Sequence, residues 1–398
     1  MLLFTAWIVD YIDRLVINLA LPSIGEEFGL DHTRQGLILS AFFLAYAVCQ
    51  IPGGLLADRF GSQRMLSWAM LLWSAFTALT GTAWSFAVLV AIRVLFGLGQ
   101  GVFPAAAMKA AVERTSPRER MTATGLIQSS NPFGAFAAPL ITAPLIALWG
   151  WRMSFFAVAG LGVLVWVAIR MFLPPARPEA SAEAPEQATG AGRGLLTSGV
   201  MWRFALMFFG YGIVVWGLNS WIPSYLQSER GISLTNTGVL SAIPAAVGGL
   251  TLIVGGRVSD RLQGRQRLTV APAMLVSAAA ILAMFQAHSL TAFIVLLSVA
   301  MAACTFCYTP IFTLPLRTLP AGLVGTGSGM INFGCQVAGI LVPVLMGYLI
   351  DHYSYDAAFL CLAAGAALSA VFALFTPQTS QAFRTRLGLA APQTPDEL

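Results

Sequence analysis

Charge is the scarcest property of this sequence. Only 10% of the 398 residues are Asp, Glu, Lys or Arg, whereas 57% are hydrophobic, and the mean hydropathy is +0.77. A soluble protein carries about 25% charged residues, so a protein whose whole surface meets water is excluded. The composition instead predicts a polytopic membrane protein.

Residues that bind metals or form disulfides are also few. The three histidines (His32, His288 and His352) fall between apolar runs, and the five cysteines fall within them. Cys304 and Cys307 form a C-x-x-C pair without a second pair, so we interpret them as buried apolar side chains. We expect no enzyme activity, no metal and no cofactor. The basic residues follow the loops, so we also expect no nucleic-acid partner.

Long apolar runs, by contrast, are abundant. Twelve runs reach the length of about 20 residues that a helix needs to cross a bilayer. They cover residues 2–24, 35–57, 65–84, 86–108, 121–146, 153–173, 202–226, 236–257, 269–287, 290–315, 324–350 and 356–376. We predict an all-α polytopic membrane protein of twelve transmembrane helices in two six-helix halves. The halves are 1–173 and 201–376, with a Pro/Ala/Glu/Gly-rich cytoplasmic linker at 174–200 and a cytoplasmic tail at 377–398.

Lysine and arginine are distributed unevenly between the loops. If the first helix starts in the cytoplasm, seventeen basic residues lie on the cytoplasmic side and only Arg34, Arg152 and Arg230 on the other. Cytoplasmic loops carry the excess of positive charge, so we predict that both termini are cytoplasmic, in the inner (plasma) membrane of a bacterium. No basic segment precedes the first run, and we expect no signal peptide.

Two segments of the first half recur in the second. "GGLLADRFGSQR" (53–64) matches "GGRVSDRLQGRQR" (255–267) at an offset of 202 residues, and "GLIQSSNPFGAFAAP" (125–139) matches "GMINFGCQVAGILVP" (329–343) at 204. Parallel repeats of this kind place a transport site near the membrane midplane. We predict that the repeated turn forms a gate. Its glycines would permit close helix approach and its charges would pair, and the residues are Gly54, Asp58, Arg59, Gly256, Asp260 and Arg261.

Ionisable groups interrupt the first apolar run. Asp10, Asp13 and Arg14 would each cost about 2.5–3.5 kcal/mol if they faced lipid, so we expect them to face the protein interior. Further polar groups occur in five later spans, where they could line a cavity or simply join helices by hydrogen bonds. Trp221 is the exception, since tryptophan near a span end is usually an anchor at the membrane interface.

Several motifs resemble one family. "YAVCQIPGGLLADRFG" (46–61), "YIDR" (11–14), "RVLFGLGQGVFPA" (93–105), "GWRMSFF" (150–156) and "WIPSYL" (221–226) resemble segments of the anion:cation symporter family within the major facilitator superfamily. The resemblance implies a proton-coupled symporter of small organic anions, such as sugar acids or aromatic acids, that works by alternating access as a monomer.

The resemblance also implies roles for individual residues. Arg14 would bind the substrate anion, because a guanidinium stays charged when buried and matches a carboxylate. Asp10, Asp13 and Arg93 would couple transport to protons. The full set of expected substrate-site residues is Arg14, Tyr46, Gln50, Gln100, Ser129, Asn131, Tyr211, Asn219, Asn332 and Gln336.

Two positions depart from the family pattern. Gln100 stands where the family commonly has Glu, and Asp10 stands where relatives often have Asn. We hypothesise that the second titratable group has moved from the fourth helix to the first. The alternatives are coupling to a single proton or an uncoupled uniporter.

A proton-coupled exporter of drugs or metabolites is a further alternative. Residues 125–139 lack the Gly-Pro core typical of exporters, which disfavours it. The seventh span carries no charge between Arg203 and Glu229, which favours a monoanionic substrate.

Overall fold

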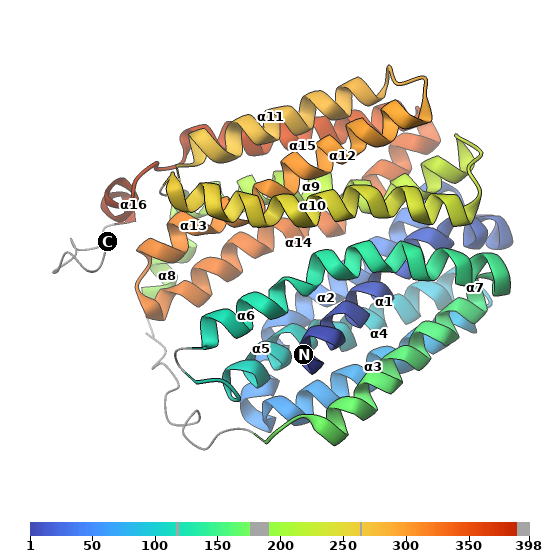
Figure 1. The fold of residues 1–398 in the computed structure, drawn as a ribbon, viewed down its shortest axis with the longest axis horizontal. Helices are drawn as coiled ribbons and strands as arrows, with labels where there is room; N and C mark the ends of the chain where they lie inside the picture. The colour runs from blue at the N-terminus through green and yellow to red at the C-terminus, as the bar shows by residue number, and fades with distance from the viewer. Residues whose placement is uncertain (117–118, 176–190, 263–264, 388–398) are drawn as a thin grey trace. The chain divides into compact units, whose positions relative to one another are not determined.

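The structure is a computed structural model that describes residues 1–116, 119–175, 191–262 and 265–387. Every regular element in these residues is a helix (Figure 1). The helices are α1 (Leu2–Phe28), α2 (His32–Phe60), α3 (Ser62–Gly81), α4 (Phe86–Gly101), α5 (Phe103–Val112), α6 (Arg120–Gln128), α7 (Ser130–Phe172), α8 (Ala191–Leu196), α9 (Gly199–Ser228), α10 (Leu234–Arg261), α11 (Gln266–Met284), α12 (Leu290–Phe306), α13 (Tyr308–Thr318), α14 (Ala321–His352), α15 (Tyr355–Phe375) and α16 (Ser380–Leu387).

The helices match the predicted spans. Within the described residues, nine helices are long and apolar enough to cross a membrane. One of them, Ala123–Phe172, holds the fifth and sixth predicted spans, which meet at Gly150 with a φ of 77°. The remaining two predicted spans are α1, which carries the buried charges, and α3. The protein is therefore an all-α polytopic membrane protein, as predicted.

Three predicted spans are interrupted rather than continuous. The fourth changes from α4 to α5 at Val102, the fifth from α6 to α7 at Ser129, and the tenth from α12 to α13 at Cys307. A proline follows each break within three residues, namely Pro104, Pro132 and Pro310. Proline has no backbone N–H and its ring clashes with the preceding turn, so each of these prolines removes a helical hydrogen bond next to a break.

The described chain forms two compact units. Unit 1 comprises Met1–Ala184, Asn219–Ala246 and Pro343–His352, and unit 2 comprises Pro185–Leu218, Val247–Val342 and Tyr353–Leu398. The predicted boundaries at 173 and 201 stay a prediction, and much of the predicted linker and tail lies outside the described residues.

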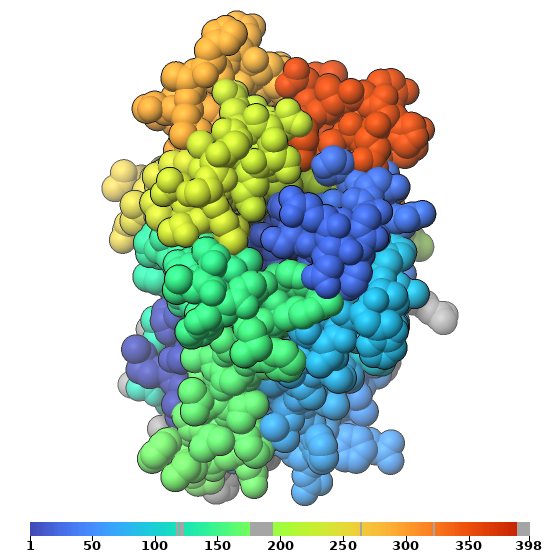
Figure 2. Space-filling view, turned by 90° about the vertical axis from the view of Figure 1, so that its right-hand side faces the viewer, coloured from blue at the N-terminus to red at the C-terminus, as the bar shows by residue number. Residues whose placement is uncertain are grey.

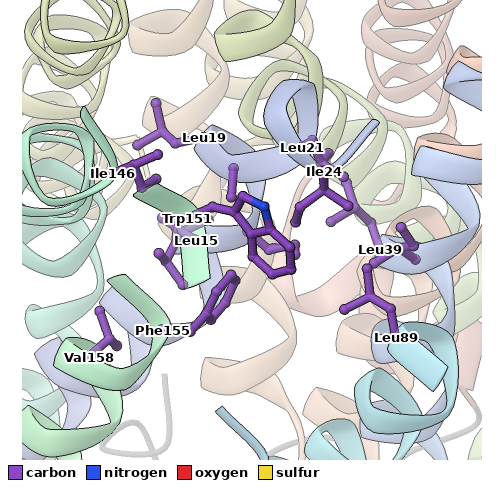
Figure 3. Packing of buried hydrophobic residues seen from close by; sticks show 14 of the residues in the cluster. Leu15, Leu19, Leu21, Ile24, Leu39, Leu89, Ile146, Trp151, Phe155 and Val158 are labelled. Carbon is purple, nitrogen blue, oxygen red and sulfur yellow. The ribbon is translucent and has the colours of Figure 1, made fainter. Parts of the chain in front are cut away.

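The core of unit 1 lies between α1 and α7. Figure 3 shows the Trp151 indole among side chains of α1, among them Leu15 and Ile24, with Phe155 nearby. Trp151 Nε1 donates to Glu27 Oε2 (2.8 Å), and Arg152 Nη2 donates to Glu27 Oε1 (2.6 Å). The "GWR" of the sequence is thus a turn at Gly150 followed by two donors that hold the end of α1.

The start of α2 packs against the last turns of α14 within unit 1. A side chain at Gly36 would overlap Pro343, and one at Gly347 would overlap His32. Asp351 accepts hydrogen bonds from the backbone N–H groups of His32 (2.9 Å) and Thr33 (2.7 Å) and from Thr33 Oγ1 (2.6 Å). The first N–H groups of a helix lack partners within the helix, so Asp351 caps α2. The turn before α2 (blue) and α7 (green) are both seen on the face shown in Figure 2.

Trp221 corrects one prediction. Its side chain is fully buried in unit 1, and its Nε1 donates to the backbone oxygen of Pro343 (3.1 Å). It therefore joins α9 to α14 instead of anchoring the chain at the membrane interface.

In unit 2, α11 packs against α12 and α15. Phe285 stacks on Phe359 at 6.4 Å between ring centroids, and Phe204 meets Phe383 of α16 edge-on at 5.8 Å. The short α16 is therefore fixed to unit 2 by a buried aromatic side chain.

We predict that Asp351→Ala lowers the free energy of unfolding by about 1–2 kcal/mol, because it removes a cap and a charged acceptor from the start of α2. Thermal unfolding of the purified protein measures this change. Asp356→Ala, which removes an exposed carboxylate five residues later, is the matched control. Equal stability of both variants would contradict the capping role.

Candidate functional site

The three charged residues in the first half of α1 are buried, as the cost of exposing them to lipid predicted. Asp10 and Asp13 are each 1% exposed and Arg14 is 8% exposed. All three belong to unit 1, where α1 packs against α7 and lies near α4. A buried charge requires partners, and each of these side chains has them.

Arg14 lies in a closed ring of hydrogen bonds with two other residues. Its Nη2 donates to Asp10 Oδ2 at 3.1 Å, and its Nε donates to Gln100 Oε1 at 3.2 Å. Gln100 Nε2 donates in turn to the backbone oxygen of Asp10 at 3.2 Å. An ionised glutamate at position 100 could not donate to that oxygen. The amide is thus suited to this position, and Asp10 supplies the carboxylate.

Aromatic rings surround the guanidinium of Arg14. Its central carbon lies 4.6 Å from the ring centroid of Tyr46, 5.3 Å from that of Tyr11 and 5.5 Å from that of Phe42. Ring faces attract a cation, most strongly where water is excluded. These rings hold Arg14 in place while leaving its charge to be balanced by carboxylates.

Asp13 is hydrogen-bonded to Thr77, which was not among the predicted site residues. Thr77 Oγ1 of α3 lies 2.8 Å and 2.7 Å from the two carboxylate oxygens and 2.9 Å from the backbone oxygen of Trp73. A hydroxyl has one proton to donate, yet three acceptors surround it. When Asp13 is ionised, Thr77 donates to it. When Asp13 is protonated, the acid donates to Thr77, and the threonine proton turns to Trp73.

Arg93 is the second buried cation of unit 1. It is 1% exposed, with its guanidinium carbon 4.9 Å from the Phe96 ring centroid and 5.4 Å from that of Phe155. Its Nε has no hydrogen-bond partner among the described residues. It interacts electrostatically with Asp13 without direct contact. Arg93 thus balances the charge of Asp13 from a distance.

Other predicted residues of unit 1 lie apart from this ring. Gln50 is half-buried on α2, and Ser129 Oγ donates to the backbone oxygen of Leu126 (2.7 Å). Asn131 Oδ1 is buried without a partner among the described residues. The Asn219 backbone oxygen accepts from Asn18 Nδ2 at 3.0 Å.

The remaining predicted substrate residues belong to unit 2. Tyr211 stacks on Phe208 at 4.8 Å and contacts Tyr308 at 6.0 Å between ring centroids. Asn332 is half-buried, and Gln336 is buried with an Oε1 that lacks a partner among the described residues. Tyr308, which lies just after the break at Cys307, also contacts Phe208 at 5.6 Å between ring centroids.

The repeated turns contain one ion pair each. Asp58 Oδ1 accepts from Lys109 Nζ at 2.7 Å, and Asp260 Oδ1 accepts from Arg317 Nη2 at 2.7 Å. Arg59 and Arg261, the arginines of the turns themselves, are not the partners of these acids.

The glycines that permit close approach are the neighbours of the predicted ones. A side chain at Gly53 would lie 2.8 Å from Val102 Cα, and one at Gly255 would overlap the backbone of Phe306. Side chains at the predicted Gly54 and Gly256 would come no nearer than 3.9 Å and 3.5 Å to other residues, which is ordinary contact. The prediction was wrong by one residue, because both glycines of each pair look alike in sequence.

No group of three or more metal-binding side chains occurs among the residues that the structure describes. Among the described residues of unit 1, the buried charged side chains are two arginines (Arg14 and Arg93) and two aspartates (Asp10 and Asp13).

Comparison with known proteins agrees with the family resemblance of the sequence motifs. The sequence profile of the Major Facilitator Superfamily matches residues 3–343. The chain is 33% identical to a probable sulfoacetate transporter, SauU, of Cupriavidus necator, over 93% of this chain and 91% of that protein. It is 30% identical to the hexuronate transporter of Bacillus subtilis, over 94% and 92%.

Solved structures show the same fold. A D-xylose–proton symporter matches with a TM-score of 0.81 and 15% identity, over 96% of this chain and 98% of that one. A bacterial homologue of the human lysosomal transporter Spinster, inward-facing and unoccupied, matches with a TM-score of 0.79 and 21% identity, over 99% and 98%.

We predict that Thr77→Val lowers the free energy of unfolding by about 1–3 kcal/mol, because valine keeps the shape of the side chain but leaves Asp13 without its hydrogen-bond partner. Thr77→Ser keeps the hydroxyl and is the matched control. Thermal unfolding of both purified variants measures the difference. A Thr77→Val protein as stable as the serine variant would show that this contact does not hold Asp13.

Proposed function

This chain belongs to the Major Facilitator Superfamily, whose members are membrane transporters and not enzymes, and we propose that it takes up a small organic anion by proton symport. The observation that carries the proposal is the buried ring of Arg14, Asp10 and Gln100. Transport follows from the family, whereas the anion and the proton follow from the chemistry of this ring.

Arg14 is the proposed anion-binding residue. Its Nη2 already donates to a carboxylate oxygen, Asp10 Oδ2, at 3.1 Å, so the position suits a carboxylate. A substrate carboxylate that reached Arg14 would replace Asp10 as the acceptor. Relatives named for hexuronate, L-galactonate and galactarate or D-glucarate support a sugar acid as the substrate class.

The charge balance of unit 1 supports coupling to protons. Arg14 and Arg93 together carry two positive charges, and Asp10 and Asp13 carry two negative charges when both are ionised. Each proton that binds an aspartate leaves one positive charge unbalanced, which is expensive in an apolar interior. A bound monoanion restores neutrality, so the proton and the anion favour each other's binding.

The position of Asp10 supports the idea that a titratable group moved between helices. Gln100 occupies the fourth-helix position and cannot take up a proton, but it binds both Arg14 and the backbone of Asp10. Asp10 accepts a hydrogen bond directly from Arg14. Protonation of Asp10 would release Arg14 to the substrate, which links the two events through one hydrogen bond.

Asp13, Thr77 and Arg93 form the proposed second proton site. Thr77 serves both protonation states of Asp13 by turning its hydroxyl. Arg93 stabilises the ionised state from a distance. The other predicted substrate-site residues stay part of the proposal, each within its own unit.

The ion pairs of the repeated turns are the proposed inner gate. Asp58 with Lys109 and Asp260 with Arg317 would hold the helix ends in one state of the cycle and separate in the other. We further propose that both termini are cytoplasmic, because of the distribution of basic residues between loops. The repeated segments of the sequence support two six-helix halves, and we also propose that the protein is a monomer in a bacterial inner membrane.

We predict that D-galactonate and a hexuronate raise the apparent unfolding temperature of the purified protein, because a ligand that binds only the folded state stabilises it. Arg14→Ala should abolish this shift, and Arg14→Lys should weaken it, since loss of a buried partner of a charge costs about 2–5 kcal/mol of binding.

Arg34→Ala, which removes a largely exposed arginine, is the matched control and should respond like the wild type. A sugar without a carboxylate, D-xylose, should produce no shift. If neutral or cationic compounds stabilise the protein and the Arg14 variants respond normally, the anion proposal is wrong and an exporter becomes the better candidate.

We predict separate effects for the two aspartates in vesicles that contain the protein. Asp13→Asn and Asp10→Asn should each reduce proton-driven accumulation at least tenfold but retain exchange of labelled for unlabelled substrate, because exchange requires no net proton movement. Uptake with and without an imposed pH gradient measures both activities.

The two variants test different parts of the proposal. Full accumulation by Asp10→Asn would disprove the move of the titratable group and leave Asp13 as the single proton site. Wild-type protein that equilibrates substrate but never accumulates it would be a uniporter.

A further inference from the structure

Unit 2 contains a basic cavity that the proposed transport cycle does not use. It has a volume of about 610 Å³ and lies among the ends of α9, α11, α15 and α16. Three arginines line it, Arg203, Arg267 and Arg386, and none of the described residues that line it is acidic. The described lining therefore carries positive charge without a carboxylate to balance it, and such a cavity attracts an anion.

Most of the donors of these arginines have no acceptor among the described residues. Arg203 Nη1 donates to the backbone oxygen of Phe375 (2.9 Å), and Arg267 Nε donates to that of Leu374 (3.0 Å). These two bonds fix the arginines against the end of α15. A guanidinium has five N–H donors, so several per side chain stay available for the oxygens of a phosphate.

The surroundings of the cavity are apolar and exposed. Trp202 and Leu268, the chain neighbours of Arg203 and Arg267, are 42% and 54% exposed, and Phe375 is 62% exposed. The cavity lies where α9 and α11 begin and α15 ends, so these side chains face the region where lipid chains meet headgroups. A small soluble anion has no apolar part that could pack against these side chains.

A second cavity, in unit 1, provides a contrast. It has a volume of about 680 Å³ and contains Arg64, Arg114 and Arg170, but Glu113 also lines it. Arg114 is committed to Glu113, to Gln63 and to the backbone oxygens of Ala110 and Pro174. The positive charge of that cavity is partly compensated by Glu113, whereas no acidic residue is among the described residues that line the cavity of unit 2.

We infer that the cavity of unit 2 binds the phosphate of an anionic phospholipid. The three arginines bind the phosphate oxygens, and the acyl chains lie along Trp202, Leu268 and Phe375. Basic pockets at the ends of membrane helices are suited to such headgroups. This site is independent of the proposed substrate and proton residues.

The test is a titration of the purified full-length protein in detergent with phosphatidylglycerol, with bound lipid measured by native mass spectrometry. Arg386→Gln is the first variant, because Arg386 forms no hydrogen bond with described residues and its loss should not affect folding. One arginine near an anionic headgroup contributes about fivefold to affinity, so we expect binding about fivefold weaker. The triple variant with Arg203→Gln and Arg267→Gln should bind roughly 100-fold more weakly.

Arg265→Gln is the matched control. It removes the same charge two residues before Arg267 but does not line the cavity, so it should bind like the wild type. Arg203→Lys with Arg267→Lys keeps the charge and should retain more binding than the glutamines. Phosphatidylcholine, which has no net charge, should bind weakly to every variant.

Three results would overturn the inference. One is equal binding of phosphatidylglycerol by the wild type and the triple variant. Another is an equal loss in Arg265→Gln, which would indicate a general effect of surface charge. The third is displacement of the lipid by millimolar inorganic phosphate, which would assign the cavity to a soluble phosphate.

Discussion

The balance of charge inside unit 1 is the constraint on which the rest depends. Two arginines and two aspartates are buried in a protein that crosses a membrane, and none of them can face lipid without large cost. Asp10 is therefore hydrogen-bonded to Arg14. Asp13 is hydrogen-bonded to Thr77, and the more distant Arg93 balances its charge. The aromatic rings and the amide of Gln100 hold this arrangement. In the proposed cycle, a proton that binds one of these aspartates is balanced by the binding of one substrate anion.

The fold was largely predictable from the sequence, because membrane spans leave strong apolar runs. The burial of Asp10, Asp13 and Arg14 followed from the cost of exposing charge. The breaks at Val102, Ser129 and Cys307 were not predicted, although prolines follow each of them, since proline is also tolerated within membrane helices. Hydropathy depends on the length and composition of a run, so it does not detect a local break in a helix.

The site was predictable only in part. Arg14 and Gln100 were expected in one site because both are polar in apolar runs, and the structure brings them together. Thr77 was missed, because a threonine in an apolar helix usually bonds its own backbone, and it does so here as well. Trp221 was misplaced, since a tryptophan near a span end looks the same in sequence whether it faces headgroups or a neighbouring helix.

The amide at position 100 also bears on the energy source. Gln100 holds Arg14 and Asp10 through an oxygen and a nitrogen and exchanges no proton, so the ring around Arg14 contains one titratable group. If Asp13 kept its protonation state throughout the cycle, one proton moving through Asp10 together with one monoanion would transfer no net charge. The membrane voltage would then do no work on the loaded carrier, and the pH difference alone would set the limit of accumulation. A cell that had lost its voltage but kept an acidic exterior could still concentrate the substrate.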